Sequence, residues 1–155
     1  MNFVSPKNAL SSLSDKSNLE ELVNFLISEN VKILSTGGTY SQIKNITNEV
    51  IEVSEFTGFE EMMDGRVKTL HPKIHAGILA RRDSDMEILK EKNYEPIDLV
   101  VVNLYPFQET IASECSFEEA IEKIDIGGPT MIRAAAKNFK DVVVVSNPND
   151  YKQLI

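Results

Sequence analysis

The segment STGGT, residues 35–39, has the composition of an anion-binding turn. Gly37 and Gly38 let the backbone approach a negatively charged group closely, and a helix that begins there offers free N–H groups and its positive dipole end. Neighbouring hydroxyls and Lys16 could add donors and a full charge. No Gly-Lys-Ser/Thr follows, so this is not an ATPase phosphate loop. A plain glycine turn that ends a strand is the alternative interpretation.

The segment GRVKTLHPKIHAG, residues 65–77, concentrates basic groups in an acidic protein of net charge -8. Its basic side chains are Arg66, Lys68, His71, Lys73 and His75. Such a cluster beside glycines and a proline indicates a binding loop, although a solvated basic loop has the same composition. The two histidines lack the glutamate of HExxH and a cysteine pair, and Pro72 should disturb a helix there, so no metal site is predicted.

The segment DIGGPTMIRAAAKN, residues 125–138, places an acid and a base at opposite ends of an expected helix. Asp125 and Lys137 lie about 18 Å apart along an ideal helix, so they share a site only if Asp125 leads in through an extended turn. A helix C-terminus also favours a lysine through its dipole, which is the alternative for Lys137. Tyr105 offers a hydroxyl, and nothing around Cys115 indicates an activated thiol.

Strand-like and helix-like segments alternate along the chain, which predicts a layered α/β sheet. The near-continuous apolar runs are typical of parallel strands buried on both faces. Residues 54–82 form a long irregular stretch, for which a functional loop is expected. The strands are expected at 9–13, 31–34, 50–53, 97–104 and 142–145, and the helices at 19–27, 39–46, 84–92, 117–124 and 128–138.

Two helix starts carry specific signals. Ser17 followed by Glu20 fits a capping box for the first helix. In the segment GGPT, Gly128 is expected to cap the helix and Pro129 to lie in its first turn, where a missing N–H does no harm.

Polar residues follow three of the expected strands, where ligands of open parallel sheets bind. The first strand leads to Ser12, Ser14, Asp15 and Lys16, the second to Ser35, Thr36, Gly37, Gly38 and Thr39, and the fourth to Asn103, Tyr105 and Pro106. We therefore expect these three strand ends to converge on one site.

The bulk composition narrows the class of protein. A length of 155 residues, 42% hydrophobic and 26% charged, suits one soluble domain. The negative charge disfavours nucleic acid, no run reaches the roughly 18 apolar residues of a membrane span, and the N-terminus lacks a signal peptide. The single cysteine, Cys115, fits the cytoplasm.

Taken in order, the segments SDKSN, STGGT, FTGFEEMMDGRVKTLHPKIHAGILARR, IDLVVVNLYPF and IDIGGPTMIRAAAKN resemble the IMP cyclohydrolase domain of the bifunctional AICAR transformylase/IMP cyclohydrolase family. The resemblance covers nearly the whole chain. TGGT alone is shared with methylglyoxal synthase and an allosteric domain of carbamoyl phosphate synthetase. The resemblance implies a Rossmann-like parallel β-sheet with helices on both faces. It also implies that residues 1–155 are this domain, truncated at its C-terminus and without the transformylase domain.

The resemblance further implies an enzyme of purine biosynthesis that closes formyl-AICAR to IMP with loss of water. It implies no cofactor for this step, a folate only for the transformylase domain, and a cytoplasmic homodimer in the full-length enzyme, with neither nucleic acid nor membrane as partner. A regulatory nucleotide-binding module or a methylglyoxal synthase of the same fold is the alternative.

The residue roles that the resemblance implies fall into two sets. Lys137 is the catalytic group, with Lys68, Tyr105 and Asp125 close by. The nucleotide contacts, which with Ser12 complete the expected site, are Ser14, Asp15, Lys16, Thr36, Gly37, Gly38, Thr39, Arg66, Val67, Lys68, Thr69, Asn103, Leu104, Asp125 and Ile126.

Overall fold

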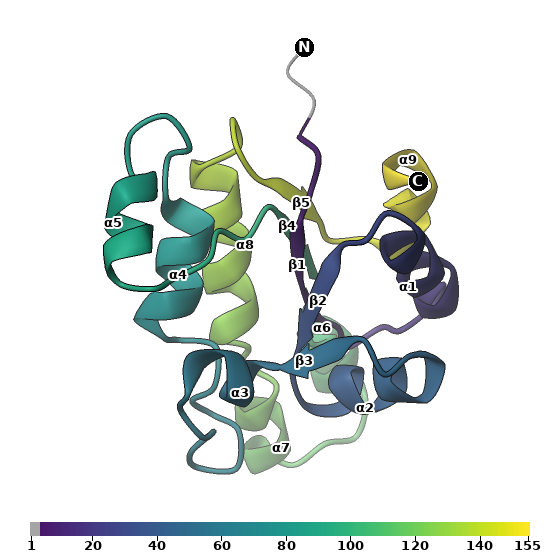
Figure 1. Cartoon of the computed structure of the whole chain (residues 1–155). Coiled ribbons are helices and arrows are strands. Elements are labelled where there is room, and N and C mark those ends of the chain that lie inside the picture. The colour runs from purple at the N-terminus through teal and green to yellow at the C-terminus, as the bar shows by residue number, and fades with distance from the viewer. Residues whose placement is uncertain (1–3) are drawn as a thin grey trace.

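A five-stranded parallel sheet runs through the centre of the protein (Figure 1), as a computed structural model describes it for residues 4–155. The strands are β1 (Asn8–Ser12), β2 (Lys32–Ser35), β3 (Val50–Glu52), β4 (Leu99–Val102) and β5 (Val143–Val145). Their order is β3-β2-β1-β4-β5, and every neighbouring pair is parallel. The expected α/β fold with a parallel sheet is therefore confirmed. The order reverses beside β1, which places a topological switch point between β1 and β4.

Successive residues of the central strands face opposite hydrophobic cores. Ala9 and its β4 partner Leu99 lie in one core, whereas the next pair, Leu10 and Val100, lies in the other. All four side chains are fully buried. This double burial explains why the strands read as continuous apolar runs and not as an alternating pattern.

Helices cover both faces of the sheet, as expected. The first core is completed by α1, α2 and α9, and the second by α3, α4 and α8, which lie on the opposite side of the sheet (Figure 1). The helices are α1 (Leu19–Ser28), α2 (Gly37–Ile46), α3 (Val53–Thr57), α4 (Pro72–Leu79), α5 (Met86–Glu91), α6 (Phe107–Ala112), α7 (Phe117–Glu122), α8 (Gly127–Lys137) and α9 (Tyr151–Leu154), with a short 3-10 turn at Pro148–Asp150.

Two expected helix caps are wrong. Helix α1 is preceded by Asn18, whose side chain makes no capping bond, and Ser17 instead donates its hydroxyl to Asp15 Oδ1 at 2.6 Å. Helix α8 begins one residue early, at Gly127, with Ile126 in the cap position, although Pro129 does lie in its first turn. At α1 the hydrogen bond of Ser17 with Asp15 replaces the expected cap. At α8 the bond from the Gly128 N–H to Asp125 Oδ1 starts the helix one residue earlier than the glycine pattern predicts.

The stretch 54–82 is more ordered than the expected irregular loop. Helix α3 occupies its start, and α4 begins at Pro72. Proline is the first residue of α4, where its fixed φ favours the helix, and His71 Nδ1 caps it by accepting the Lys73 N–H at 3.0 Å. The expectation that Pro72 disturbs a helix here was therefore wrong.

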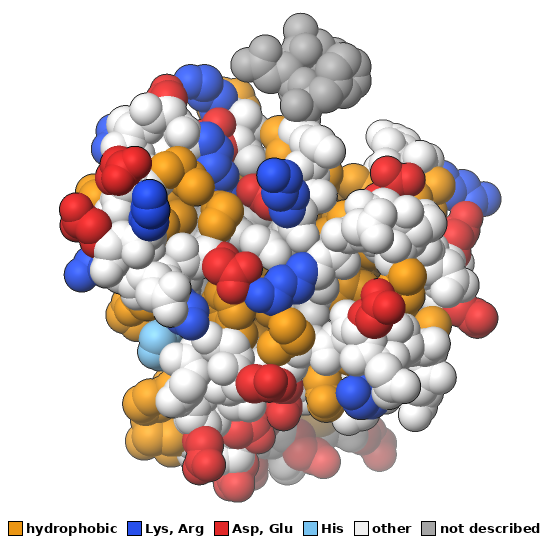
Figure 2. Space-filling view, viewed as in Figure 1, with side chains coloured by type: hydrophobic (Ala, Val, Ile, Leu, Met, Phe, Trp, Pro, Cys, Tyr) orange, Lys and Arg blue, Asp and Glu red, His pale blue; other side chains and the backbone are white. Residues whose placement is uncertain are grey.

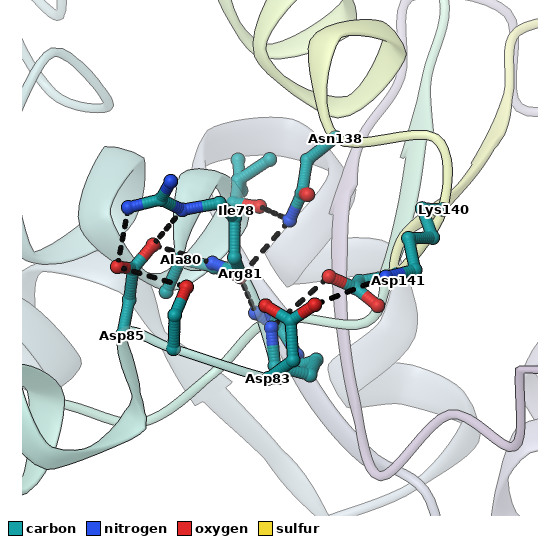
Figure 3. Close-up of polar contacts among 10 residues, drawn as sticks. Ile78, Ala80, Arg81, Asp83, Asp85, Asn138, Lys140 and Asp141 are labelled. Carbon is teal, nitrogen blue, oxygen red and sulfur yellow. Dashed lines mark hydrogen bonds and ion pairs between the residues drawn. The ribbon is translucent and has the colours of Figure 1, made fainter.

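Asn138 joins the end of α8 to the end of α4 (Figure 3). Its side-chain amide donates to the carbonyl oxygens of Ile78 and Ala80 at 2.9 and 3.0 Å, and the residue is only 8% exposed. These carbonyls lie at a helix end, where backbone acceptors lack helical partners. The last residue of the motif RAAAKN thus has a structural role.

Arg82 continues this network across the amino ends of the strands. Its guanidinium donates to the Ile97 carbonyl at 2.9 Å and to Asp98 Oδ1 at 3.2 Å. The other Asp98 oxygen accepts the backbone N–H groups of Lys7 and Asn8. Because these residues lie at or directly before the first residues of β1 and β4, the network fixes the two central strands at the edge away from their carboxyl ends.

Tyr151 anchors the last helix in the core beside α1. It is 1% exposed, and its hydroxyl is buried without a hydrogen-bond partner in the described part of the chain. Burial, with a smaller contribution from the charge of Asp15, raises the pKa of this phenol to about 12. The neutral form is therefore strongly preferred in the folded protein.

We expect Asn138→Ala to lower the free energy of unfolding by about 1–3 kcal/mol, because it leaves two buried carbonyls without their donor. Urea unfolding measures the change. Asn24→Ala, at an exposed position of α1, is the control and should change stability by less than about 0.5 kcal/mol. Equal effects of the two substitutions would contradict the role assigned to Asn138.

We also expect the phenol of Tyr151 to ionise only near pH 12, well above the ordinary tyrosine pKa of about 10. Since the folded pKa exceeds the unfolded one, the contribution of Tyr151 to stability is complete below pH 10 and is lost as the pH rises toward 12. An absorbance titration of wild type and Tyr151→Phe measures this. If Tyr151→Phe removed a tyrosine that ionises near pH 10 and not one that ionises near pH 12, the raised pKa of Tyr151 would be refuted.

Candidate functional site

A cleft of about 530 Å³ opens at the carboxyl ends of β1, β2 and β4. The three strand ends predicted to converge do so here. Thirteen of the predicted site residues line the cleft: Ser12, Ser14, Lys16, Thr36, Gly38, Thr39, Arg66, Lys68, Thr69, Asn103, Tyr105, Asp125 and Ile126. The cleft thus lies beside the switch point of the sheet, where ligands of such folds bind.

One end of the cleft is built around the first turn of α2. Gly37 has a φ of 57°, and Thr36 precedes the helix in extended conformation without a side-chain cap. A Cβ at Gly37 would lie 3.3 Å from Lys68 Nζ, and one at Gly38 would lie 3.9 Å from Lys16 Nζ. Two ammonium groups therefore flank an uncapped helix N-terminus, an arrangement that attracts an anion.

The loop that carries Lys16 is fixed by two side chains. Asn103 Oδ1 accepts the N–H groups of Ser14 and Asp15 at 2.7 and 2.8 Å, and its Nδ2 donates to the Asp15 carbonyl at 2.7 Å. Thr39 Oγ1 accepts the Leu13 N–H at 2.9 Å and donates to the Leu13 carbonyl at 3.1 Å. Most of the hydrogen-bonding capacity of both side chains is thus used to position the loop.

The other end of the cleft is the start of α8. Asp125 Oδ1 accepts the Gly128 N–H at 2.9 Å. A Cβ at Gly127 would clash with Thr69 Oγ1, and one at Gly128 would lie 2.7 Å from Asp125 Oδ2. The glycine pair is therefore required for Thr69 and Asp125 to approach the helix start closely.

A third wall, from α7 and the residues that follow it, was missed by the sequence analysis. Ile121, Glu122, Lys123 and Ile124 line the cleft, and Asp64 and Gly65 complete the opposite rim. Glu122 forms an ion pair with Arg66 across the cleft. The only sequence signal was the position of this helix just before Asp125, because a short helix rich in glutamate otherwise indicates a solvent-exposed surface.

Four predicted residues lie next to the cleft without lining it. Gly37 borders Lys68, and Leu104 packs against the Gly128 backbone. Asp15 is exposed and bonded to Ser17, and Val67 pairs with Met62 in an isolated antiparallel bridge.

Lys137 is not brought to the cleft. It is the exposed last residue of α8, and Gly127, at the cleft, begins the same helix ten residues earlier. Ten residues of α-helix span about 15 Å. The structure therefore gathers Lys68, Tyr105 and Asp125 around one cleft and leaves Lys137 outside it.

Hydrogen bonding and burial shift the pKa values of three groups around the site. Hydrogen bonds from Ser17 lower the pKa of Asp15, and the bond to Glu122 raises that of Arg66. Burial lowers the pKa of His75, whose Nε2 is buried without a partner among the described residues. His75 is consequently neutral near pH 7.

No three His, Cys, Asp or Glu side chains in residues 4–155 are grouped so that they could hold a metal ion. No helix in the same range is both long and apolar enough to cross a membrane.

Comparison with known proteins shows the family. The profile of the MGS-like domain matches residues 18–130. The bifunctional purine biosynthesis protein PurH of Fusobacterium nucleatum is 57% identical over 96% of this chain and 30% of its own length, and PurH of Clostridium acetobutylicum is 59% identical over the same shares. The chain thus spans about 30% of the length of these relatives.

A solved structure is similar over most of its length. The crystal structure of ForH superposes with a TM-score of 0.80 and 37% identity, and the match covers 96% of this chain and 77% of that one. Together with the PurH relatives, it confirms the family resemblance. The chain belongs to the MGS-like domain family and corresponds to the MGS-like part of the PurH proteins.

Proposed function

We propose that this domain is an IMP cyclohydrolase, which binds formyl-AICAR by its 5′-phosphate and closes the second ring of the purine. The main support is the cleft itself, which has a cationic helix start at one end and an acidic helix start at the other. The purine-biosynthesis name of the PurH relatives adds to it.

The phosphate is assigned to the α2 end of the cleft. Lys16 and Lys68 would supply two charges, and the uncapped N–H groups of α2 would supply hydrogen bonds. The reacting groups of the substrate would then extend toward Tyr105 and Asp125, which line the remainder of the cleft.

The reaction joins two groups of one molecule. The carboxamide nitrogen attacks the formyl carbon, and water leaves, so catalysis depends largely on holding these atoms together. The formyl oxygen becomes an oxyanion that needs donors. At the start of α8, Pro129 has no N–H and the Gly128 N–H is bonded to Asp125, so the Gly127 N–H is the donor that this helix start offers to the oxygen.

The nitrogen must lose a proton, and the departing hydroxyl must gain one. Asp125 and Tyr105 are the cleft groups suited to this exchange. Asp125 retains Oδ2 for a substrate proton, since the hydrogen bond from Gly128 is accepted by Oδ1. We propose that no metal or organic cofactor is needed for this step.

Lys137 remains in the proposal through the resemblance alone. A direct part in proton transfer requires the substrate-bound protein to bring its ammonium to the cleft, from a position about 15 Å along α8 from Gly127. The role of Lys137 is therefore tested by measuring kcat, which reports the chemical step, separately from the affinity for IMP.

Lys16→Ala should weaken the binding of IMP about 10- to 150-fold, the effect of losing a charged hydrogen bond of about 1.5–3 kcal/mol. Titration calorimetry of IMP and inosine measures this. Inosine should bind poorly to both proteins, and Lys44→Ala, at the far end of α2, should leave IMP binding unchanged. If wild type bound inosine as tightly as IMP, the phosphate assignment would be wrong.

Wild type should convert formyl-AICAR to IMP, followed by absorbance, and should do so equally after exhaustive chelation. Asp125→Asn should lower kcat about 100- to 10,000-fold, as should Lys137→Ala if Lys137 transfers a proton. Lys137→Arg keeps the charge but cannot release a proton. A normal kcat in Lys137→Arg would assign the transfer to the cleft residues, and no IMP from wild type would refute the proposed function.

A further inference from the structure

Helix α7 forms the least anchored wall of the cleft. Its neighbour in the chain, α6, contacts it, and neither helix contains a buried residue. Their large apolar side chains remain exposed, with Phe117 at 76% and Ile111 at 53%. Burial of apolar area, the main stabilising term elsewhere in the fold, therefore contributes little to the position of this wall.

One polar contact connects these helices to the opposite side of the cleft. Among the described residues, the hydrogen bonds and ion pairs of residues 107–124 stay within the segment or reach Tyr105 and Pro106 just before it, except for the ion pair of Glu122 with Arg66. Arg66 belongs to the loop that also carries Lys68, so this pair spans the cleft from one wall to the other.

We propose that Glu122 is a positioning residue for the nucleotide site: by pairing with Arg66 it holds α7 across the cleft. Ile121 and Ile124 flank Glu122 and line the cleft, so the pair also keeps two apolar side chains against the ligand. Opening of the pair lets α7 move outward and frees the ligand. The proposed function enters only in the choice of IMP as the probe.

The pair is exposed, so its effect should be modest. The side chains of Arg66 and Glu122 are 61% and 57% exposed, and exposed pairs change an equilibrium by about two- to fivefold. The chain offers a matched control in the pair of Lys140 and Asp83, which is 60% and 64% exposed and does not line the cleft (Figure 3).

The first measurement is amide hydrogen exchange over residues 107–124 in the ligand-free protein. Glu122→Gln should speed exchange about two- to fivefold there, because local opening becomes more frequent. Asp83→Asn should leave it unchanged. On the background of Arg66→Gln, Glu122→Gln should add nothing, since the two residues act through one interaction.

The second measurement is the kinetics of IMP binding. Glu122→Gln should raise the dissociation rate about two- to fivefold with little change in the association rate, and Asp83→Asn should change neither. Unchanged exchange in Glu122→Gln, or an equal effect on the Arg66→Gln background, would overturn the inference whatever IMP does. Failure of wild type to bind IMP would instead count against the proposed function, and exchange alone would then decide the role of Glu122.

Discussion

Burial of the parallel sheet on both faces is the constraint on which the rest of the structure depends. Because both faces are covered, each strand must be apolar throughout, and polar chemistry is confined to the strand ends. Parallel strands bring all their carboxyl ends to one edge, so the loops after β1, β2 and β4 meet there. The side chains of Asn103 and Thr39 then fix the loop that carries Lys16 by hydrogen bonding to its backbone.

The amino edge of the sheet stabilises the fold, and the carboxyl edge carries the cleft. At the amino edge, Arg82, Asp98 and Asn138 tie α4, α8 and the central strands together through backbone carbonyl and N–H groups. At the carboxyl edge, charged side chains line an open cleft. Several of them are lysine or arginine, although the protein as a whole has a net charge of -8. On the face of the molecule drawn in Figure 2, acidic and basic side chains are interspersed with apolar ones. Helix α8 connects the two edges, because it begins at the cleft with Gly127 and ends with Lys137, directly before Asn138.

The sequence predicted the sheet and most of the cleft because both follow from local patterns. Continuous apolar runs predicted parallel strands, and the strand ends predicted Ser14, Lys16, Asn103 and their neighbours. Helix α4 was not predicted, because its start depends on a histidine cap and on a proline at its first position. The helix at α7 was predicted, but its place at the cleft was not. That place depends on a contact with Arg66, 56 residues away in the sequence, and no local pattern indicates such a contact. The distance between Lys137 and the cleft likewise depends on the axis of α8 and not on its motif.

The binding mode of the nucleotide is tested most directly by a crystal structure of this protein with bound IMP. We predict that the 5′-phosphate lies at the first turn of α2, with its oxygens about 3 Å from backbone N–H groups and from the ammonium groups of Lys16 and Lys68, and that the purine is directed toward Asp125. A phosphate bound at the start of α8, or IMP bound outside the cleft, would contradict this prediction.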